Sequence, residues 1–323
     1  MLAPVEFTNQ NHFKFGYDDQ WFSNRVSKNQ QWNCSYGKIS EVGLNVKEAN
    51  KRAARLIYQN AQKLSRKVCL LLSGGSDSEV AARAFLDAQV PFTAVMLEYG
   101  KNEKDVDNHF ELQYANILVQ KYQIPSIRIK LDLGNFWSFD NTEFVEIAHL
   151  TQCTSPQLIT TMWLARQIHN KHNGYVVLGQ GEPLVYRQFD QWWFREKELI
   201  GSWAKFWCFD KINGTSGFHQ YTPEQMLAYL TDPIVVEFIK DPAKTNPDPV
   251  GIFDNAMIKH LLYQTHYPDS ELVNRKKYTG FENQFWIEWQ IRGWLREIFP
   301  YNTSEFTIEY NKMISNLRGS KSS

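Results

Sequence analysis

The chain has 323 residues, of which 43% are hydrophobic and 22% are charged, a composition typical of a globular protein with a substantial core. Lysine plus arginine and aspartate plus glutamate each number 35, and this zero net charge argues against a dedicated nucleic-acid-binding protein without excluding a nucleic-acid substrate. The four cysteines are far apart, the N-terminus lacks the pattern of a secretory signal, and no apolar run is long enough to cross a bilayer. We therefore expect a cytoplasmic protein with reduced thiols and no membrane contact.

From Lys47 onward, helix-like and strand-like patterns alternate along the chain. The apolar run at 68–72 is typical of a strand buried on both faces. Helices are expected over 47–67, 78–89, 104–123 and 155–172, and strands over 68–72, 91–99, 125–133 and 174–181. This order predicts an α/β fold in which a parallel sheet carries helices on both faces and binds its ligand at the carboxyl edge.

The stretches before and after this alternation differ from it in character. Residues 1–46 are polar and aromatic, and their weak periodicity predicts an irregular extension with a strand or two. After Glu182 the chain is rich in aromatic residues and mostly helical in pattern, although 189–210 fits a helix and a strand equally well. We expect three parts: an N-terminal extension (1–46), a ligand-binding α/β domain (47–184) and a mostly helical C-terminal substrate or lid region (185–323).

A short polar turn, SGGSDS, ends the first predicted buried strand. Its two glycines leave backbone N–H groups open to a ligand, and the helix that follows presents its free N–H groups and the positive end of its dipole. Serine hydroxyls add donors, whereas an aspartate in an anion site requires a cation, which makes Asp77 a candidate magnesium ligand. The phosphate cradle would consist of Ser73, Gly74, Gly75, Ser76, Asp77 and Ser78. The alternative is an ordinary glycine-rich turn in which Asp77 caps the helix.

The stretch LLLSGGSDSE resembles the PP-loop of the N-type ATP pyrophosphatases, whose pattern is SGGxDS after the first strand. That superfamily includes asparagine synthetase, β-lactam synthetase, argininosuccinate, GMP and NAD synthetases, tRNA thiolases and lysidine synthase. The resemblance implies the adenine nucleotide alpha hydrolase-like fold, with ATP and Mg²⁺ as cofactors. It also implies that a substrate oxygen attacks the α-phosphorus of ATP, which releases pyrophosphate, and that a nucleophile then displaces AMP.

Residues 176–186, VVLGQGEPLVY, are similar to the GxGxDE segment of the asparagine-synthetase-like branch. Gly179 and Gly181 match its glycines, which would let substrate approach, and the resemblance implies that Glu182 helps to hold magnesium. Pro183 replaces the second acid of that pattern. The alternative is a plain glycine turn that leaves the strand.

Residues 274–283, NRKKYTGFEN, are similar to the KxxLRE-like run of the same branch. The resemblance implies that Lys277, or Lys276 in its place, stabilises charge developing on pyrophosphate, with Glu282 at the matching spacing. Gly280 and Phe281 replace the Leu-Arg pair of that run. A solvated basic patch is the alternative.

These features together predict an AMP-forming ligase of the asparagine-synthetase-like branch without a glutaminase domain, since residue 2 is leucine and only 46 residues precede the first core helix. It would adenylate a carboxylate or carbonyl oxygen of a small-molecule or nucleobase acceptor and transfer it to nitrogen from ammonia, a substrate amine or a separate donor. Whether the protein forms a homodimer is also left open by the sequence. One alternative is a nucleobase- or tRNA-modifying enzyme that inserts sulfur or an amine, with Cys153 at a helix start as the activated thiol and Cys208 as its candidate partner. The other is a non-catalytic nucleotide-binding module.

Overall fold

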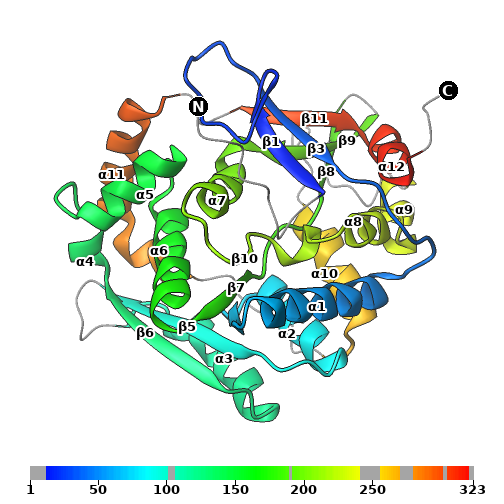
Figure 1. Ribbon diagram of the computed structural model, residues 1–323, viewed down its shortest axis with the longest axis horizontal. Coiled ribbons are helices and arrows are strands. Elements are labelled where there is room, and N and C mark those ends of the chain that lie inside the picture. The colour runs from blue at the N-terminus through cyan, green and yellow to red at the C-terminus, as the bar shows by residue number, and fades with distance from the viewer. Residues whose placement is uncertain are drawn as a thin grey trace.

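A parallel sheet of five strands forms the centre of the molecule (Figure 1). The computed structural model describes residues 12–100, 106–188, 191–240, 255–269, 279–300 and 304–319. The strand order is β10-β7-β4-β5-β6, and every neighbouring pair is parallel. The strands are β4 (Lys67–Leu71), β5 (Thr93–Gly100), β6 (Ser126–Asp132), β7 (Gly174–Leu178) and the short β10 (Gly214–Thr215). The predicted parallel α/β sheet is confirmed, and β10 adds a strand that the sequence did not predict.

Helices cover both faces of this sheet, as the continuous apolar run of β4 predicts. Val68 and Leu70 of β4 pack in one core cluster, whereas Cys69 and Leu71 pack in the other, because successive side chains of a strand point to opposite faces. The first face is covered by α1 (Val46–Lys63), α2 (Ser76–Asp87) and α3 (His109–Lys121). The second is covered by α5 (Thr142–Thr151), α6 (Pro156–Lys171) and α7 (Glu198–Phe209), with α4 (Leu133–Phe136) between β6 and α5.

The flanking segments form two smaller antiparallel sheets. The N-terminal sheet has the order β2-β1-β3, from β1 (Phe13–Tyr17), β2 (Gln20–Trp21) and β3 (Trp32–Tyr36). The C-terminal sheet has the order β11-β9-β8, from β8 (Leu184–Gln188), β9 (Gln191–Lys197) and β11 (Glu305–Glu309). Within the ambiguous stretch at 189–210, the structure describes a strand, β9, followed directly by a helix, α7.

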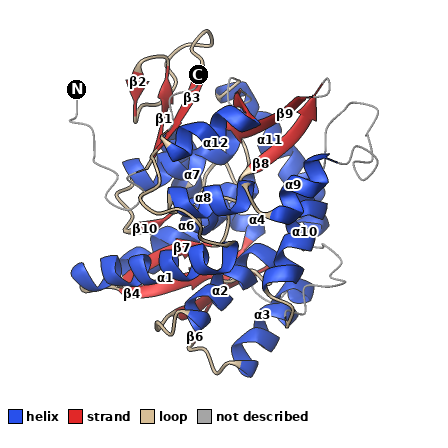
Figure 2. Cartoon of the chain, turned by 90° about the vertical axis from the view of Figure 1, so that its right-hand side faces the viewer, coloured by secondary structure: helices blue, strands red, loops and turns tan. Residues whose placement is uncertain are grey.

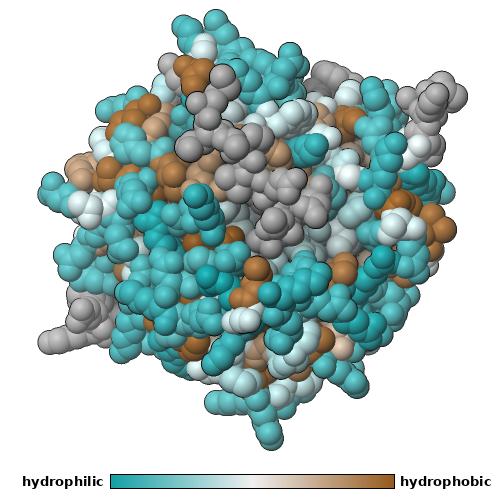
Figure 3. Space-filling model, in the orientation of Figure 1, coloured by the Kyte–Doolittle hydropathy of each residue, from teal (hydrophilic) through white to brown (hydrophobic). Residues whose placement is uncertain are grey.

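The C-terminal region is otherwise helical, as expected, and Figure 2 shows its last helix, α12, beside the small sheets. Its elements are η1 (Phe218–Gln220), α8 (Pro223–Leu230), α9 (Pro233–Lys240), α10 (Asn255–His266), η2 (Phe281–Gln284), α11 (Phe285–Ile298) and α12 (Tyr310–Arg318). The face in Figure 3 is mostly hydrophilic, with scattered apolar patches. In the described part of the chain, no helix has both the length and the apolar character needed to cross a membrane.

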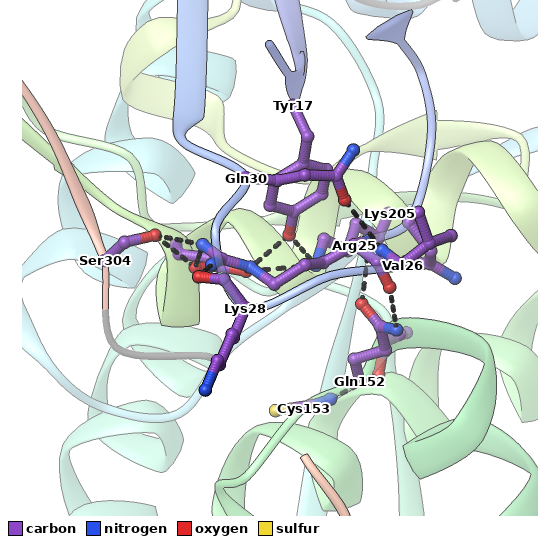
Figure 4. Close-up of polar contacts among 12 residues, drawn as sticks. Tyr17, Arg25, Val26, Lys28, Gln30, Gln152, Cys153, Lys205 and Ser304 are labelled. Atoms are coloured by element: carbon purple, nitrogen blue, oxygen red, sulfur yellow. Dashed lines mark hydrogen bonds and ion pairs between the residues drawn. The ribbon is translucent and has the colours of Figure 1, made fainter. Parts of the chain in front are cut away.

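A buried ion cluster joins the N-terminal sheet to α7 and to the residue that precedes β11 (Figure 4). Arg25 donates to Glu198 at 2.7 Å and to the Ser304 hydroxyl at 2.5 Å, and Tyr17 and Ser304 also donate to Glu198. Lys205 donates to the Tyr17 hydroxyl at 2.5 Å. Burial lowers the pKa of Lys205 to about 8, although the negative charge of Glu198 opposes this shift. The cluster therefore fixes three segments that are far apart in the sequence.

Candidate functional site

The polar turn after β4 leads into the N-terminus of α2 and is held by hydrogen bonds that its own serine side chains make. Gly75 N–H donates to Ser73 Oγ at 3.2 Å, and Ser78 Oγ donates to the Gly75 carbonyl at 2.9 Å. Gly74 has φ +91°, and a Cβ there would lie 2.0 Å from the Glu111 carbonyl oxygen, so this position requires glycine. Gly75 is the N-cap of α2 and makes no side-chain capping bond. The first turn, which begins at Ser76, can therefore offer backbone N–H groups to an anion.

Asp77 lies in this first turn, and its side chain and backbone meet residues from the C-terminal region. Lys259 Nζ lies 2.9 Å from Asp77 Oδ2, and the Tyr263 hydroxyl donates to Asp77 Oδ1 at 2.9 Å. The His219 ring nitrogen Nε2 lies 3.1 Å from the Asp77 carbonyl oxygen. His219 also stacks on Tyr263, with 5.7 Å between ring centroids. Burial lowers the pKa of His219, although Asp77 and Glu182 oppose the shift, so the ring is neutral at physiological pH.

Glu182 shares Lys259 with Asp77. Lys259 Nζ lies 2.8 Å from Glu182 Oε1, so one ammonium bridges two carboxylates. Burial alone would lower the pKa of Lys259, but Glu182 and Asp77 outweigh burial and raise it, so the lysine stays protonated. The structure thus brings together the two carboxylates predicted to hold a metal, and it adds a cation that the sequence interpretation missed.

Two glycines explain how the loop after β7 reaches the first turn of α2. A Cβ at Gly179 would lie 2.6 Å from Ser78 Cα, and Gly181 has φ +101° with its Cβ position 2.9 Å from Gln220 Cγ. These glycines allow backbone to pack closely against α2 and η1, and this packing sets Glu182 beside Asp77. Their described role is thus close packing, whereas the approach of a substrate stays a prediction.

A cavity of about 260 Å³ opens beside the turn at the carboxyl ends of β4, β5 and β7. Its polar wall includes Ser73, Gly75, Asp77, Ser78 and Gln180, and its apolar wall includes Val95, Leu97, Leu164, Trp203 and Phe281. This is the sheet edge at which the alternation predicted a ligand site. A mostly apolar pocket with a few polar groups at one end suits an organic ligand that carries an anionic group.

An aromatic stack borders this cavity. The Phe281 ring lies 4.3 Å from the Tyr99 ring and 5.5 Å from the Trp137 ring, and both pairs are nearly parallel. Gly280 has φ +88° and packs against the Asp107 carbonyl, while Gln284 Nε2 donates to the Asp107 carboxylate at 2.6 Å. Asp107 therefore holds η2, and with it Phe281, against the cavity.

The carboxylate pair fits the ligand preference of magnesium in part. Oxygen atoms of Asp77 and Glu182 converge on one cation, and hard carboxylate oxygens are the ligands that Mg²⁺ prefers. Within the described residues, no group of three histidine, cysteine or acidic side chains could surround a metal. Magnesium sites often combine one or two carboxylates with water and substrate phosphate oxygens, so these residues fit a magnesium ion that arrives with a phosphate ligand.

The two candidate lysines of the predicted motif, Lys276 and Lys277, lie outside the described residues. Glu282, the acid of that motif, accepts bonds from the backbone and the hydroxyl of Thr279 and thus shapes the start of η2. Lys259 and Tyr263 stand four residues apart on α10, a spacing that places them on one helix face. That spacing was the one sequence signal for this part of the site.

The alternative in which Cys153 is an activated thiol has no support in the described geometry. The side chain is completely buried, and burial raises its pKa to about 11, with a weaker opposing effect from Ser155. Burial likewise raises the pKa of Cys208 to about 11. The Cys153 thiol accepts from the backbone N–H of Ser155, the N-cap of α6, at 3.5 Å, but this contact lowers its pKa less than burial raises it. Figure 4 shows Cys153 beside Gln152, whose side chain bonds the backbone of Arg25 in the buried ion cluster.

Comparison with models of protein families finds no match, and comparison with curated protein sequences finds none. Among solved structures, the chain is similar to NMN synthetase from Francisella tularensis, with 14% identity over 86% of this chain and 94% of that chain and a TM-score of 0.37. It is similar to NH3-dependent NAD synthetase from Campylobacter jejuni, with 15% identity over 80% and 95% and a TM-score of 0.36. It is also similar to a tRNA thiolase from Methanococcus maripaludis, with 16% identity over 85% and 78% and a TM-score of 0.34. These similarities are distant. The fold and the site are therefore described from the residues of this chain alone.

Proposed function

We propose that this protein is an ATP-dependent, AMP-forming ligase that adenylates a carboxylate or carbonyl oxygen and releases pyrophosphate. The observation that carries the proposal is the meeting of Asp77, Lys259 and Glu182 at an uncapped helix N-terminus beside the cavity. Backbone N–H groups, a lysine and a carboxylate pair suited to Mg²⁺ are what a site for the charged end of ATP requires.

Each group has a part in this proposal. The cradle residues Ser73, Gly74, Gly75, Ser76 and Ser78 would bind the β- and γ-phosphates, which leave as pyrophosphate. Asp77 and Glu182 would hold magnesium, which when bound offsets negative charge on the phosphate oxygens. Lys277 stays a proposed second cation for the leaving group.

The reaction would proceed in two displacements. A substrate oxygen attacks the α-phosphorus, the bond between the α-phosphorus and the bridging oxygen breaks, and pyrophosphate leaves with that oxygen. A nitrogen nucleophile then attacks the activated carbon, and AMP leaves with the substrate oxygen. The nitrogen would come from ammonia, from a substrate amine or from a separate donor.

The cavity supports a ring-containing ligand. Its apolar wall and the stack of Tyr99, Phe281 and Trp137 suit a flat aromatic ring, such as the adenine of ATP or a nucleobase acceptor. Membership of the asparagine-synthetase-like branch is proposed from the resemblance of the GQGE segment to the pattern of that branch. The buried, protonated Cys153 gives no support to the sulfur-inserting alternative.

The test is to incubate the protein with ATP, Mg²⁺ and a panel of amino acids, other carboxylates and nucleobases, and to measure the products. We expect pyrophosphate and AMP in equal amounts with the correct acceptor. ADP as the product would contradict the proposal, and tight nucleotide binding without pyrophosphate release would favour the non-catalytic module.

A matched pair of variants on α2 sharpens this test. Asp77→Asn removes a charge from the cation site, so we expect pyrophosphate release to fall by about 100-fold or more. Asp87→Asn makes the same change at the other end of the helix, where the carboxylate pairs with Lys47 at 3.1 Å, and should leave the activity unchanged. Equal activity of both variants would exclude Asp77 from the site.

A further inference from the structure

Lys259 takes the position between two carboxylates that a divalent cation would need. Its ammonium lies 2.9 Å from Asp77 Oδ2 and 2.8 Å from Glu182 Oε1. The other Asp77 oxygen accepts from Tyr263 at 2.9 Å. A metal ion between the same two oxygens would therefore displace the ammonium.

Charge favours exchange over joint occupancy. Among the residues that the structure describes, Lys259 is the cation paired with these two carboxylates, so it balances one of their two negative charges, whereas a divalent cation balances both. An ammonium and a divalent ion held within about 4 Å of each other would repel strongly in a partly buried site. All three side chains are mostly buried, so solvent screens this repulsion poorly.

The helix that carries Lys259 is anchored, but its ammonium is on a flexible stem. Ile258, Leu262 and Tyr263 are fully or almost fully buried, and α10 packs against α2 and β8. The lysine side chain has four rotatable carbon links, so its charge can move while the helix stays in place. The exchange thus needs a rotation of one side chain and no opening of the fold.

We propose that Lys259 is a displaceable internal cation, which holds Asp77 and Glu182 together without metal, yields the pair to a divalent ion and then turns to the phosphate that accompanies it. The first step concerns the apo protein alone. The second step rests on the proposed function, because it requires a phosphate ligand at the N-terminus of α2. Lys259 would thereby keep the metal site weak until the metal arrives with its phosphate ligand.

The first step is tested with Mn²⁺ alone, by titration of the full-length protein followed by electron paramagnetic resonance. Lys259→Met removes the competing charge and keeps the length of the stem, so we expect Mn²⁺ to bind about 10-fold tighter or more. Lys47→Met, which removes the partner of Asp87 elsewhere on the fold, should bind Mn²⁺ as the unaltered protein does. Adding Glu182→Gln to Lys259→Met should abolish the gain. Unchanged or weaker Mn²⁺ binding by Lys259→Met, in a protein with an intact folding transition, would overturn the proposal.

The second step is tested with inorganic pyrophosphate at saturating Mn²⁺, by calorimetry. Here the same Lys259→Met variant should bind pyrophosphate about 10-fold more weakly, because the freed ammonium no longer contacts it. Opposite effects on Mn²⁺ and pyrophosphate distinguish exchange from a merely structural role, which would weaken both. Unchanged pyrophosphate binding would refute the second step. Since neither titration needs turnover, a protein that shows the exchange but never releases pyrophosphate would refute the proposed function alone.

Discussion

At the scale of single residues, the backbone of the polar turn decides which positions tolerate a side chain. Gly74 has a positive φ, and its missing Cβ makes room for the Glu111 carbonyl, whereas Gly75 has an ordinary extended conformation. The sequence interpretation put both glycines in one phosphate cradle. Only the structure separates them, because the neighbouring carbonyl comes from α3.

Gly74→Ala should destabilise the fold by at least about 1–3 kcal/mol, because alanine would be strained at this φ and would collide with backbone. Gly75→Ala is the matched control, since its Cβ would meet only Ser73 Oγ at 3.3 Å. Urea denaturation measures both variants. Equal stability of the two would show that the turn does not have the described geometry.

A second residue-scale prediction concerns Glu196 on β9. Burial raises its pKa to about 8 from 4.5, and Glu182 adds to the shift while a hydrogen bond from Tyr36 opposes it. The folded state keeps this proton between pH 4.5 and 8, whereas the unfolded chain releases it, so the carboxyl group makes stability fall as pH rises through that window. Glu196→Gln should remove this fall and stabilise the protein at pH 8 by a few kcal/mol, on the order given by the linkage relation.

Urea denaturation at several pH values between 5 and 8 checks the effect of Glu196→Gln. Glu297→Gln, at an exposed position of α11, is the control and should follow the unaltered protein. Parallel pH profiles for the two variants would argue against a buried, protonated Glu196.

At the scale of elements, the sequence predicted the strands and turns that are formed by contiguous residues. It did not predict the contacts between residues far apart in the chain. The strands and the turn before α2 are contiguous, so their periodicity and glycines suffice to place them. Lys259 reaches Asp77 across 182 positions of sequence, and the spacing of Lys259 and Tyr263 on one face of α10 does not identify Asp77 as their partner. The stretch at 189–210 divides into β9 and α7 because tertiary pairing with β8 and β11 selects the strand, which periodicity alone cannot do.

The loop between β7 and β8 yields an element-scale prediction. Gly179→Ala should push this loop away from α2, because the new Cβ would lie 2.6 Å from Ser78 Cα, and pyrophosphate release should fall at least about 10-fold as Glu182 moves from Asp77. Gly293→Ala on α11 is the opposite case, since nothing lies within 4 Å of its Cβ position. That variant should keep its activity and gain about 0.5–1 kcal/mol of stability from helix propensity. Steady-state kinetics and thermal denaturation of both proteins supply the comparison.

At the scale of the whole molecule, the parallel sheet was predictable from element order, whereas the contacts between the flanking sheets and the core were not. The cluster of Tyr17, Arg25, Glu198, Lys205 and Ser304 draws on segments that carry no shared sequence pattern. The division at residues 46 and 184 stays a prediction about function. Long-range ion pairs of this kind appear only once the chain is folded.

Glu198→Gln should destabilise the protein by about 3–5 kcal/mol, because it leaves the buried charges of Arg25 and Lys205 without a counter-ion. Glu305→Gln breaks a more exposed pair, with Arg195 at 3.5 Å, and should cost less than about 1 kcal/mol. Chemical denaturation followed by circular dichroism measures both changes. If the two variants were equally stable, the cluster would not contribute to the fold as described.

The same cluster has a consequence for the order in which the protein can form during synthesis. Residues 13–36 are synthesised before α7 and before Ser304, yet Arg25 is neutralised by Glu198 on α7 and bonded to Ser304. The strands β1 and β3 therefore keep apolar side chains exposed until the segment through Ser304 has been translated. The parallel sheet, whose residues lie between 67 and 215, can pair before that moment. Nascent chains of this protein should thus depend on chaperones for residues 13–36 more than for the strands of the parallel sheet.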